Sequence, residues 1–543
     1  MKNTCLSSKE IHQEFIKINK SFCRLVLWKI SDRKGEAESS HRTLCLLATD
    51  NSAESICLYC YFIKEKIPFL LVDASTSKER LQQIIHSFQP AYLFVPEGEG
   101  DFLPSSDYGR KEVYGQYVCW RFTKESVWQS HRVAPEVAVL LSTSGSTGSS
   151  KFVVLTYENL ESNADSIIQS LGMKQGERTA VMLPISYSYG LSVVNSTLKA
   201  SGTLLIPDGM MMEKSYWDFL EKERVNIIYG VPYTYEVFQK RKLWRRPWED
   251  LRLITQAGGA LSYEMKKALL EEVGQRRGKG QNIDLAIMYG QTEATARMSC
   301  FFLNYYPEKI HSVGRAIPGG RFSIAEPDGE SRGEILYEGR NVSLGYALSW
   351  RDLTEDIQCQ KQDSGKSDGE RKVSIDSIEK DSVGTGRLLH TGDIGWLDDD
   401  GFLYITGRKS RFMKVQGYRF SLDELQEELE EEIQRGFIAE SPDELQDNGQ
   451  FRMTLKVVCV NGFNEGKEWL GVVVERTASQ KVQGNKECKD QAIDKMIWKN
   501  VNVYFQKNHF KKNDYGLVII EEIPRRSNGK IDYQKLEKLF KQR

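Results

Sequence analysis

The sequence lacks a long hydrophobic run and an excess of charge of either sign. No apolar segment approaches the roughly 18 residues that mark a membrane-spanning helix, and Met1–Lys34 has neither the apolar core nor the cleavage site of a secretion signal. The 74 Lys and Arg residues balance 75 Asp and Glu residues, for a net charge of −1. We therefore expect a cytoplasmic protein without a membrane span, and its charge does not point to nucleic acid as a partner.

Cysteine shows no pattern of pairing. The ten cysteines are scattered along the chain, and the close pair Cys57 and Cys60 has no second pair with which to complete a zinc site. We expect reduced thiols with structural roles, as in a cytosolic protein, and no metal bound by cysteine.

Short apolar strands alternate with helical patterns over the first half of the chain. Thr43–Ala48 and Phe69–Val72 are predicted strands, and Ser52–Glu65 between them has the spacing of a helix. The same alternation continues as far as the predicted strand Asp284–Tyr289. Strand, helix and strand in this order are typical of a parallel sheet. The sequence therefore predicts an α/β fold with a large body of doubly wound sheets.

The pattern changes twice further along. After about Ser312, short strands separated by Gly and Asp turns predict a β-rich subdomain, interrupted by the polar segment Thr354–Gly386, which we interpret as a solvated insertion. Beyond Arg411, a very acidic helix and several strands predict a small α+β domain. We expect a large N-terminal domain at residues 1–409 and a small, mobile C-terminal domain at residues 410–543.

The segment Leu140–Lys151, LLSTSGSTGSSK, carries the strongest chemical signal. Gly145 and Gly148 allow backbone N–H groups to turn inward, the hydroxyls add donors, and Lys151 supplies a positive charge, which together suit a polyphosphate. The glycine spacing fits neither a P-loop nor a dinucleotide fingerprint. A Ser/Gly-rich segment can also be a linker; its place at the end of a predicted strand favours a ligand site.

This segment resembles the nucleotide loop of the adenylate-forming superfamily, which includes acyl-CoA synthetases, firefly luciferases and the adenylation domains of nonribosomal peptide synthetases. Further segments match motifs of that family in the same order, namely QAGGALS at Gln256–Ser262, MYGQTEAT at Met288–Thr295, the long match His390–Gln426, and PRRSNGKID at Pro524–Asp532. The resemblance implies that ATP and a carboxylic acid form acyl-AMP and pyrophosphate with Mg²⁺ as cofactor. A thiol of CoA, or of carrier-protein phosphopantetheine, then takes the acyl group.

The resemblance also assigns roles to residues of these motifs. Nucleotide binding is implied for Thr143, Ser144, Gly145, Ser146, Thr147, Gly148, Lys151, Gly258, Gly259, Ala260, Tyr289, Gly290, Gln291, Thr292, Asp393 and Arg408. Within that set, Tyr289 stacks near adenine, Thr292 contacts the α-phosphate and Asp393 accepts the ribose hydroxyls. Glu293 holds the magnesium ion. Lys530 is the catalytic lysine that stabilises the transition state, together with Thr292 and Glu293.

The C-terminal domain of the family swings between the two half-reactions. The hinge position corresponds to Ser410, where Asp or Lys is usual in the family. The segment that follows, with Lys414 and Gly417, enters the site for thiol transfer. The charge interactions that accompany the usual hinge residue are therefore left unassigned here.

The substrate pocket is implied to lie around Tyr187, Tyr189 and Tyr233, although aromatic packing is an equally good interpretation of these rings. Amino-acid-activating relatives commonly carry an aspartate that pairs with the substrate ammonium, whereas the corresponding segment Pro184–Ser192, PISYSYGLS, has no acid. Burying an ammonium without a counter-charge is costly. The sequence therefore favours a carboxylic acid without an amino group.

We expect a free-standing acid–thiol ligase whose partners are a small carboxylic acid and, in trans, a possible acyl or peptidyl carrier protein. Two alternatives stay open. One is a stand-alone amino-acid-adenylating enzyme that acts with a carrier protein. The other is a non-catalytic nucleotide-binding homologue, against which the retention of Lys530, Glu293 and Asp393 weighs.

Overall fold

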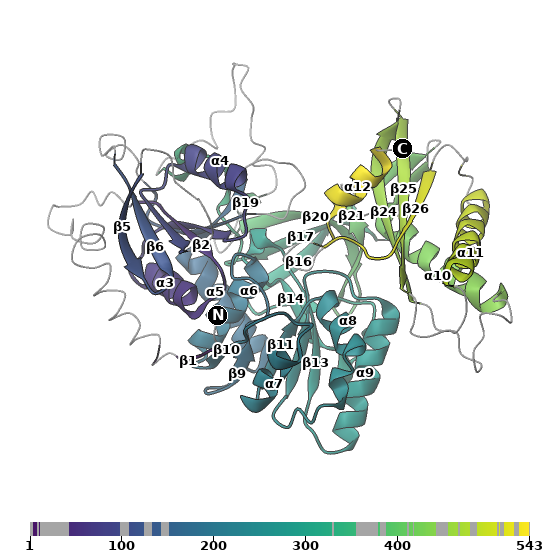
Figure 1. The fold of residues 1–543 in the computed structure, drawn as a ribbon, viewed down its shortest axis with the longest axis horizontal. Helices are drawn as coiled ribbons and strands as arrows, with labels where there is room; N and C mark the ends of the chain where they lie inside the picture. Colours follow the sequence, from purple (N-terminus) through teal and green to yellow (C-terminus); the bar gives the residue numbers. More distant parts are fainter. Residues whose placement is uncertain are drawn as a thin grey trace. The chain divides into compact units, whose positions relative to one another are not determined.

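The computed structural model describes residues 4–7, 10, 43–97, 108–123, 133–142, 151–327, 331–354, 378–380, 387–409, 412–415, 418–440, 454–464, 467–477, 486–507, 510, 515–525 and 531–541 (Figure 1). The chain divides into two compact units. Unit 1 comprises Met1–Ser323, Leu336–Thr391 and Leu397–Leu403, and unit 2 comprises Ile324–Ile335, Gly392–Trp396 and Tyr404–Arg543. Over the residues given above, none of the helices has both the length and the apolar character needed to cross a bilayer.

The first sheet of unit 1 has eight strands within the described residues, in the order β18-β8-β7-β3-β2-β4-β6-β5. Their bounds are β2 Cys45–Thr49, β3 Phe69–Asp73, β4 Tyr92–Pro96, β5 Tyr108–Tyr114, β6 Tyr117–Phe122, β7 Val137–Ser142, β8 Phe152–Thr156 and β18 Gly345–Ala347. The central strands β7, β3, β2 and β4 run parallel, and the outer strands pair antiparallel. Helices α3 (Ala53–Lys64) and α4 (Lys78–Phe88) connect the parallel strands.

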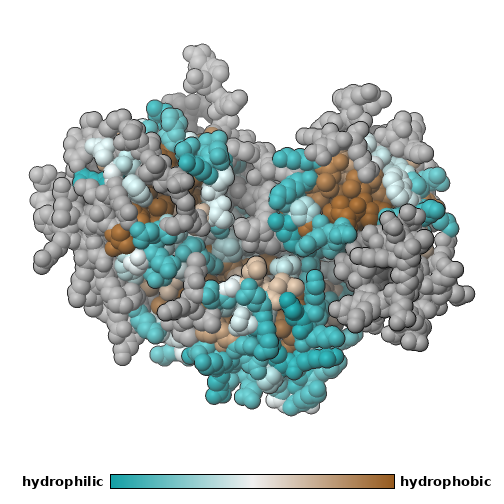
Figure 2. Space-filling view, viewed as in Figure 1, coloured by the Kyte–Doolittle hydropathy of each residue, from teal (hydrophilic) through white to brown (hydrophobic). Residues whose placement is uncertain are grey.

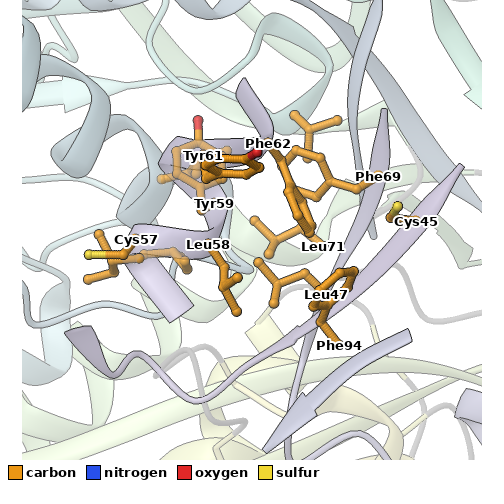
Figure 3. Packing of buried hydrophobic residues seen from close by; sticks show 14 of the residues in the cluster. Cys45, Leu47, Cys57, Leu58, Tyr59, Tyr61, Phe62, Phe69, Leu71 and Phe94 are labelled. Carbon is orange, nitrogen blue, oxygen red and sulfur yellow. The ribbon is translucent and has the colours of Figure 1, made fainter. Parts of the chain in front are cut away.

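Both faces of this sheet are buried, because successive side chains of a strand point to opposite faces. On β2, Cys45 and Leu47 pack with the apolar face of α3, where Phe62 lies edge-on to Phe94 (Figure 3). The intervening Leu46 packs instead in the cluster that contains α4. The sheet is therefore covered by helices on both sides, which confirms the predicted doubly wound α/β arrangement.

The second sheet of unit 1 also has eight described strands, in the order β1-β10-β9-β11-β12-β13-β14-β15. Their bounds are β1 Thr4–Ser7, β9 Arg178–Ala180, β10 Thr203–Ile206, β11 Ile227–Gly230, β12 Leu253–Gln256, β13 Asp284–Tyr289, β14 Ser299–Phe302 and β15 Arg315–Ala316. Strands β10, β9, β11, β12 and β13 run parallel. Helices α5 (Tyr157–Leu171), α6 (Ser188–Lys199), α7 (Lys214–Lys222), α8 (Pro232–Lys240) and α9 (Tyr263–Gly278) intervene in the chain. The outer surface over α9 is hydrophilic (Figures 1 and 2).

A third sheet has the order β16-β17-β20-β19, and β21 also pairs with β20. The bounds are β16 Gly320–Ala325, β17 Gly333–Gly339, β19 Ile378–Lys380, β20 Arg387–Leu397 and β21 Leu403–Arg408. These are the short strands that the Gly- and Asp-rich texture predicts. Strand β19 lies within the segment predicted to be a solvated insertion, so three of those residues instead pair antiparallel with β20. Residues 355–377 and 381–386 lie outside the described part of the chain.

The C-terminal part of unit 2 is built on the sheet β24-β25-β26, with the separate hairpin β22-β23. The bounds are β22 Phe412–Val415, β23 Tyr418–Ser421, α10 Leu422–Glu440, β24 Thr454–Asn464, β25 Lys467–Thr477, α11 Lys486–Lys507, β26 Tyr515–Ile520 and α12 Tyr533–Lys541. Leu425 and Leu429 of α10 pack with Val472 and with Ile497 of α11 on one face of the sheet. Leu536 of α12 packs on the other face. This is the α+β composition that the sequence predicts.

Candidate active site

The candidate site of unit 1 lies where two parallel strands end. Strand β12 leads directly into Gly258, Gly259 and Ala260, and strand β13 leads into the run Gly290–Glu293. The two strands are hydrogen-bonded neighbours, with Gln256 opposite Ile287. The carboxyl ends of parallel strands meet at one edge of the sheet, where ligands of open α/β folds bind. The structure therefore brings the two motifs together.

Gly258 allows the first turn to close tightly. Its φ of +82° is left-handed, and a Cβ at this position would lie 2.8 Å from the Tyr187 hydroxyl and 3.1 Å from Val231 Cγ1. Gln256 Nε2 donates a hydrogen bond to the Gly259 carbonyl at 2.6 Å, which holds the turn. The result is a strip of backbone without side chains, suited to contact with a flat ring.

The second turn is also closed by backbone contact. A Cβ at Gly290 would lie 1.7 Å from the Ala296 carbonyl oxygen, so no larger residue fits. Gln291 Nε2 donates to the Tyr289 hydroxyl at 3.3 Å and to the Thr391 carbonyl at 3.0 Å. Thr292 Oγ1 lies 3.0 Å from Ser188 Oγ of α6. These bonds fix Thr292 and its neighbours relative to α6.

Glu293 is held by a residue that the sequence analysis did not identify. The Tyr346 hydroxyl on β18 donates to Glu293 Oε1 at 2.8 Å, and Lys151 Nζ lies 3.4 Å from the centroid of the same ring. Burial lowers the pKa of Lys151 below its usual value, and the negative charge of Glu293 partly offsets that effect. Tyr346 gives no signal in the sequence, since an aromatic residue in a strand is usual for packing.

The donor set at Glu293 fits magnesium. Over the part of the chain that the structure describes, no group of three or more His, Cys, Asp or Glu residues could hold a metal ion. Mg²⁺ differs from structural metals in this respect, because it typically takes one or two carboxylates and completes its shell with phosphate oxygens and water. One carboxylate oriented by Tyr346, near a lysine that can meet phosphate, is sufficient.

The three tyrosines of the predicted substrate pocket belong to one hydrophobic cluster. Tyr189 is buried, its hydroxyl lies 2.9 Å from Thr255 Oγ1, and its ring stands edge-on to those of Tyr187 and Tyr229. Burial raises the pKa of Tyr189 to about 12, with Arg297 opposing the shift, so the phenol is neutral. Tyr187 and Tyr233 are half-buried at the edge of the cluster.

A second residue missed in the sequence is Asn51, which follows β2 of the other sheet. Its Nδ2 donates to the Leu183 carbonyl at 3.0 Å, and its Oδ1 accepts from the Ile185 amide at 2.8 Å. Its φ of +64° is left-handed, a conformation that Asn tolerates better than most residues. Asn51 thus clamps the backbone that leads to Tyr187 and Tyr189.

In unit 2, the structure brings Asp393 and Arg408 together. Asp393 is 3% exposed on β20, and its Oδ1 lies 3.0 Å from Arg408 Nε on β21. Beside them, Glu334 accepts hydrogen bonds from the Gly392 amide and from Lys409 Nζ, each at 3.2 Å. Asp393, with its implied ribose contact, and Arg408, with its implied ribose or phosphate contact, are therefore neighbours on adjacent strands.

Other candidate residues lie outside the described part of the chain. They are Thr143, Ser144, Gly145, Ser146, Thr147, Gly148, Ser410, Gly417 and Lys530. Lys414 lies on β22, of which the backbone alone is described. The roles of these residues stay predictions.

Comparison with known proteins identifies the family. A family model described as AMP-binding enzyme matches residues 40–347. A D-alanine–D-alanyl carrier protein ligase of Staphylococcus epidermidis is 26% identical over 379 residues, which cover 68% of each chain. A feruloyl-CoA synthase of an Amycolatopsis species is 24% identical over 300 residues. A 2-succinylbenzoate–CoA ligase of Lactococcus lactis is 25% identical over 276 residues. The matched regions of these last two relatives span about half of their length, 54% and 50%.

Solved structures share the fold over nearly the whole chain. An o-succinylbenzoate CoA synthetase from Bacillus subtilis, in complex with its acyl-adenylate intermediate, has a TM-score of 0.61 and 16% identity and covers 98% of both chains. A four-domain nonribosomal peptide synthetase bound to AMP and glycine has a TM-score of 0.63 at 16% identity, over 97% of this chain and 34% of that one. The family model matches more than half of the 543 residues, and the protein therefore belongs to the AMP-binding enzymes.

Proposed function

We propose that this AMP-binding enzyme is an acid–thiol ligase. It uses ATP to convert a carboxylic acid into acyl-AMP, releases pyrophosphate, and passes the acyl group to a thiol of CoA or of a carrier-protein phosphopantetheine. The observation that carries the proposal is the group at the end of β13, where Thr292 and the Tyr346-bound Glu293 adjoin Lys151. Relatives that join acids to CoA or to a carrier protein support the same reaction.

The nucleotide would lie along the two glycine turns. The bare backbone at Gly258 and Gly259 accepts the adenine ring, with Ala260 and Tyr289 beside it, and Asp393 and Arg408 take the ribose. Lys151 meets the negative charge of the phosphates, together with the loop of residues 143–148. Glu293 holds Mg²⁺, which neutralises phosphate charge when it is bound.

Activation requires two anions to approach each other, so positive charge and orientation determine the rate. Thr292 donates to the α-phosphate, and Ser188 fixes its hydroxyl at 3.0 Å. Lys530 stabilises the negative charge on the oxygens of the pentavalent transition state, in which the carboxylate oxygen attacks phosphorus and pyrophosphate leaves. Burial around Tyr189 keeps water away from the acyl-adenylate, which would otherwise hydrolyse.

Thiol transfer is proposed to follow a movement of residues 410–543 against residues 1–409. Ser410 is the pivot, and the segment with Lys414 and Gly417 would then admit the pantetheine arm. Either CoA or a carrier protein in trans can supply that arm.

A second candidate is adenylation of an amino acid, because one relative joins D-alanine to a carrier protein. The segment Pro184–Ser192 has no acid to pair with an ammonium, which favours an acid without an amino group.

The test is exchange of labelled pyrophosphate into ATP, with a panel of fatty, aryl, dicarboxylic, hydroxy and amino acids. We expect exchange with a subset of the acids that lack an amino group, and a large loss in Lys530→Ala. Exchange with amino acids alone would establish the second candidate. ATP binding without exchange for any acid would show a non-catalytic homologue. Addition of CoA or of a phosphopantetheinylated carrier protein then identifies the acceptor.

A further inference from the structure

A buried arginine lies directly after the motif that carries Glu293. Arg297 is 2% exposed, and its Nε and Nη2 have no hydrogen-bond partner among the described residues. A guanidinium stays protonated even when buried. A buried charge without a hydrogen-bonded partner is costly, so this arrangement needs an explanation.

The backbone around Arg297 is firmly fixed. Asn163 of α5 donates to the Arg297 carbonyl at 2.9 Å and accepts from the Arg297 amide at 3.3 Å. Asn341 Nδ2 donates to the same carbonyl at 2.9 Å. Three bonds from two side chains hold this residue, so its side chain cannot reach solvent by a local backbone shift.

The described side chains that interact electrostatically with the guanidinium are those of Tyr189, Tyr229 and Cys300. The Cζ of Arg297 lies 4.7 Å from the centroid of the Tyr189 ring. Burial raises the pKa values of Tyr229 and of Cys300 although the positive charge of Arg297 opposes both shifts. These neighbours therefore carry no negative charge near pH 7. Tyr189 offers a cation–π contact and a hydrogen bond that opposes the rise of its own pKa, but Nε and Nη2 of Arg297 still have no partner among the described residues.

The two unpartnered nitrogens form one edge of the guanidinium, which matches the two oxygens of a carboxylate. The same chain uses this edge elsewhere. Arg224 binds Asp250 through Nε at 2.6 Å and Nη2 at 3.0 Å, and Arg252 binds Glu177 through the same two atoms. At Arg297, the carboxylate that completes such a pair is not supplied by the described residues.

Arg297 is close to the reaction site but separate from Thr292. Thr292 contacts Ser188, whereas Arg297 stacks on the next residue, Tyr189. Consecutive residues of a helix point about 100° apart. A group bound at Arg297 would therefore lie on another side of α6 from the carboxylate that reacts at Thr292.

We propose that Arg297 binds a second carboxylate of the acid substrate through its Nε and Nη2 atoms, so that the enzyme activates a dicarboxylic acid at one end. This inference rests on the proposed function. Tyr189 packs over the bound pair, and Tyr187 and Tyr233 line the chain that joins the two carboxylates. The second carboxylate supplies the hydrogen bonds and the charge that Arg297 lacks.

The decisive comparison uses the unaltered protein. Straight-chain dicarboxylic acids of increasing length are compared with their half-amides, in which a neutral amide replaces the second carboxylate, and with monocarboxylic acids of equal length. Pyrophosphate exchange gives kcat/KM, and calorimetry in the presence of AMP gives the binding constant. We expect kcat/KM for one diacid to exceed that for its half-amide by about 30-fold or more, as for a buried charge pair. Most of this difference should lie in KM.

Variants test the residue itself. Arg297→Met removes the charge at similar volume and is expected to abolish the preference for the diacid while retaining activity on the half-amide, and Arg297→Lys should restore part of the preference. Arg224→Met is the matched control, because that arginine pairs with Asp250 at the surface and should leave the preference unchanged.

Four results would overturn the inference. The first is a diacid that binds no better than its half-amide at every length. The second is an equal loss of activity with every acid in Arg297→Met, which is the result expected if Arg297 has only a structural role. The third is a preference that survives in Arg297→Met. The fourth is exchange with monocarboxylic acids alone, which would refute the binding of a second carboxylate at Arg297 but leave the proposed function intact. If no acid supports exchange, calorimetry still decides whether the diacid is preferred, and the proposed function alone has failed.

Discussion

The hydroxyl of Tyr346 donates to the carboxylate of Glu293 at 2.8 Å, although the two residues lie in segments more than fifty positions apart. Its ring meanwhile lies 3.4 Å from Lys151 Nζ. One side chain therefore contacts both the proposed magnesium ligand and the proposed phosphate ligand, and two substitutions can separate these contacts.

Tyr346→Phe removes the hydroxyl but keeps the ring. We expect about a 10-fold higher Mg²⁺ requirement for ATP binding, because groups that orient a metal ligand affect metal affinity by this order. Tyr346→Leu also removes the ring beneath Lys151 and should weaken ATP binding further. Calorimetry at several Mg²⁺ concentrations measures both effects. If ATP binding depends equally on Mg²⁺ in Tyr346→Phe and in the unaltered protein, the Tyr346 hydroxyl does not orient Glu293 for Mg²⁺.

Gly258→Ala should impair nucleotide binding more than folding. Both Gly258 and Gly280 have left-handed φ values, +82° and +89°, but a Cβ at Gly280 meets nothing within 4 Å. Backbone strain should cost each variant about 1 kcal/mol of stability, and Gly258→Ala should lose somewhat more because its Cβ crowds the Tyr187 hydroxyl. Gly258→Ala alone should raise the KM for ATP. Urea unfolding and ATP titration measure the two quantities. A similar KM in both variants would argue against adenine lying on this turn.

Lys151 should be unusually reactive toward amine reagents. Burial lowers its pKa, so more of the free amine is present at pH 8 than for an exposed lysine, and the pH midpoint of its labelling lies below 10.5. Because the negative charge of Glu293 raises this pKa, Glu293→Gln should shift the midpoint lower still. Mass spectrometry of labelled peptides over a pH series gives the midpoints. A midpoint that moves upward in Glu293→Gln would contradict the assigned interaction.

Asn51 should contribute to stability through its two bonds to the backbone at Leu183 and Ile185. Asn51→Gly tolerates the φ of +64° and removes the bonds, and we expect a loss of about 2 kcal/mol in the free energy of unfolding. Asn51→Ala adds the strain of a left-handed alanine and should lose more. Equal stability of Asn51→Gly and the unaltered protein, measured by urea unfolding, would show that the clamp is dispensable.

Local patterns predict the elements of this fold well where burial is uniform. The sequence predicts β13 at Asp284–Tyr289, and the structure has the same bounds. It did not anticipate the hairpin of β5 and β6. Strand β5 lies at the edge of its sheet with a bulge between Arg110 and Glu112, and edge strands tolerate charged residues that hide the alternation.

The sequence likewise predicts some residues of the candidate site and misses others. The glycine turns at Gly258 and Gly290 follow from motifs that are continuous in the sequence, and the structure places them side by side. Tyr346, Asn51 and Arg297 escaped notice, because each acts through a partner from a distant segment. Tyr346 reaches the site because β18 pairs with β8, opposite Val153. Such pairing is a property of the whole fold and leaves no local signal.

Two strands, β7 and β8, flank the predicted nucleotide loop, and this arrangement affects how the affinity for phosphate can evolve. Ser142 of β7 pairs with Phe152 of β8, so a strand follows Lys151, whereas a P-loop runs directly into a helix whose backbone dipole attracts phosphate. A dipole of that kind belongs to the main chain and persists through substitutions. The share of the attraction that Lys151 would supply belongs to a side chain, and a single codon change can therefore remove that share without rebuilding the fold.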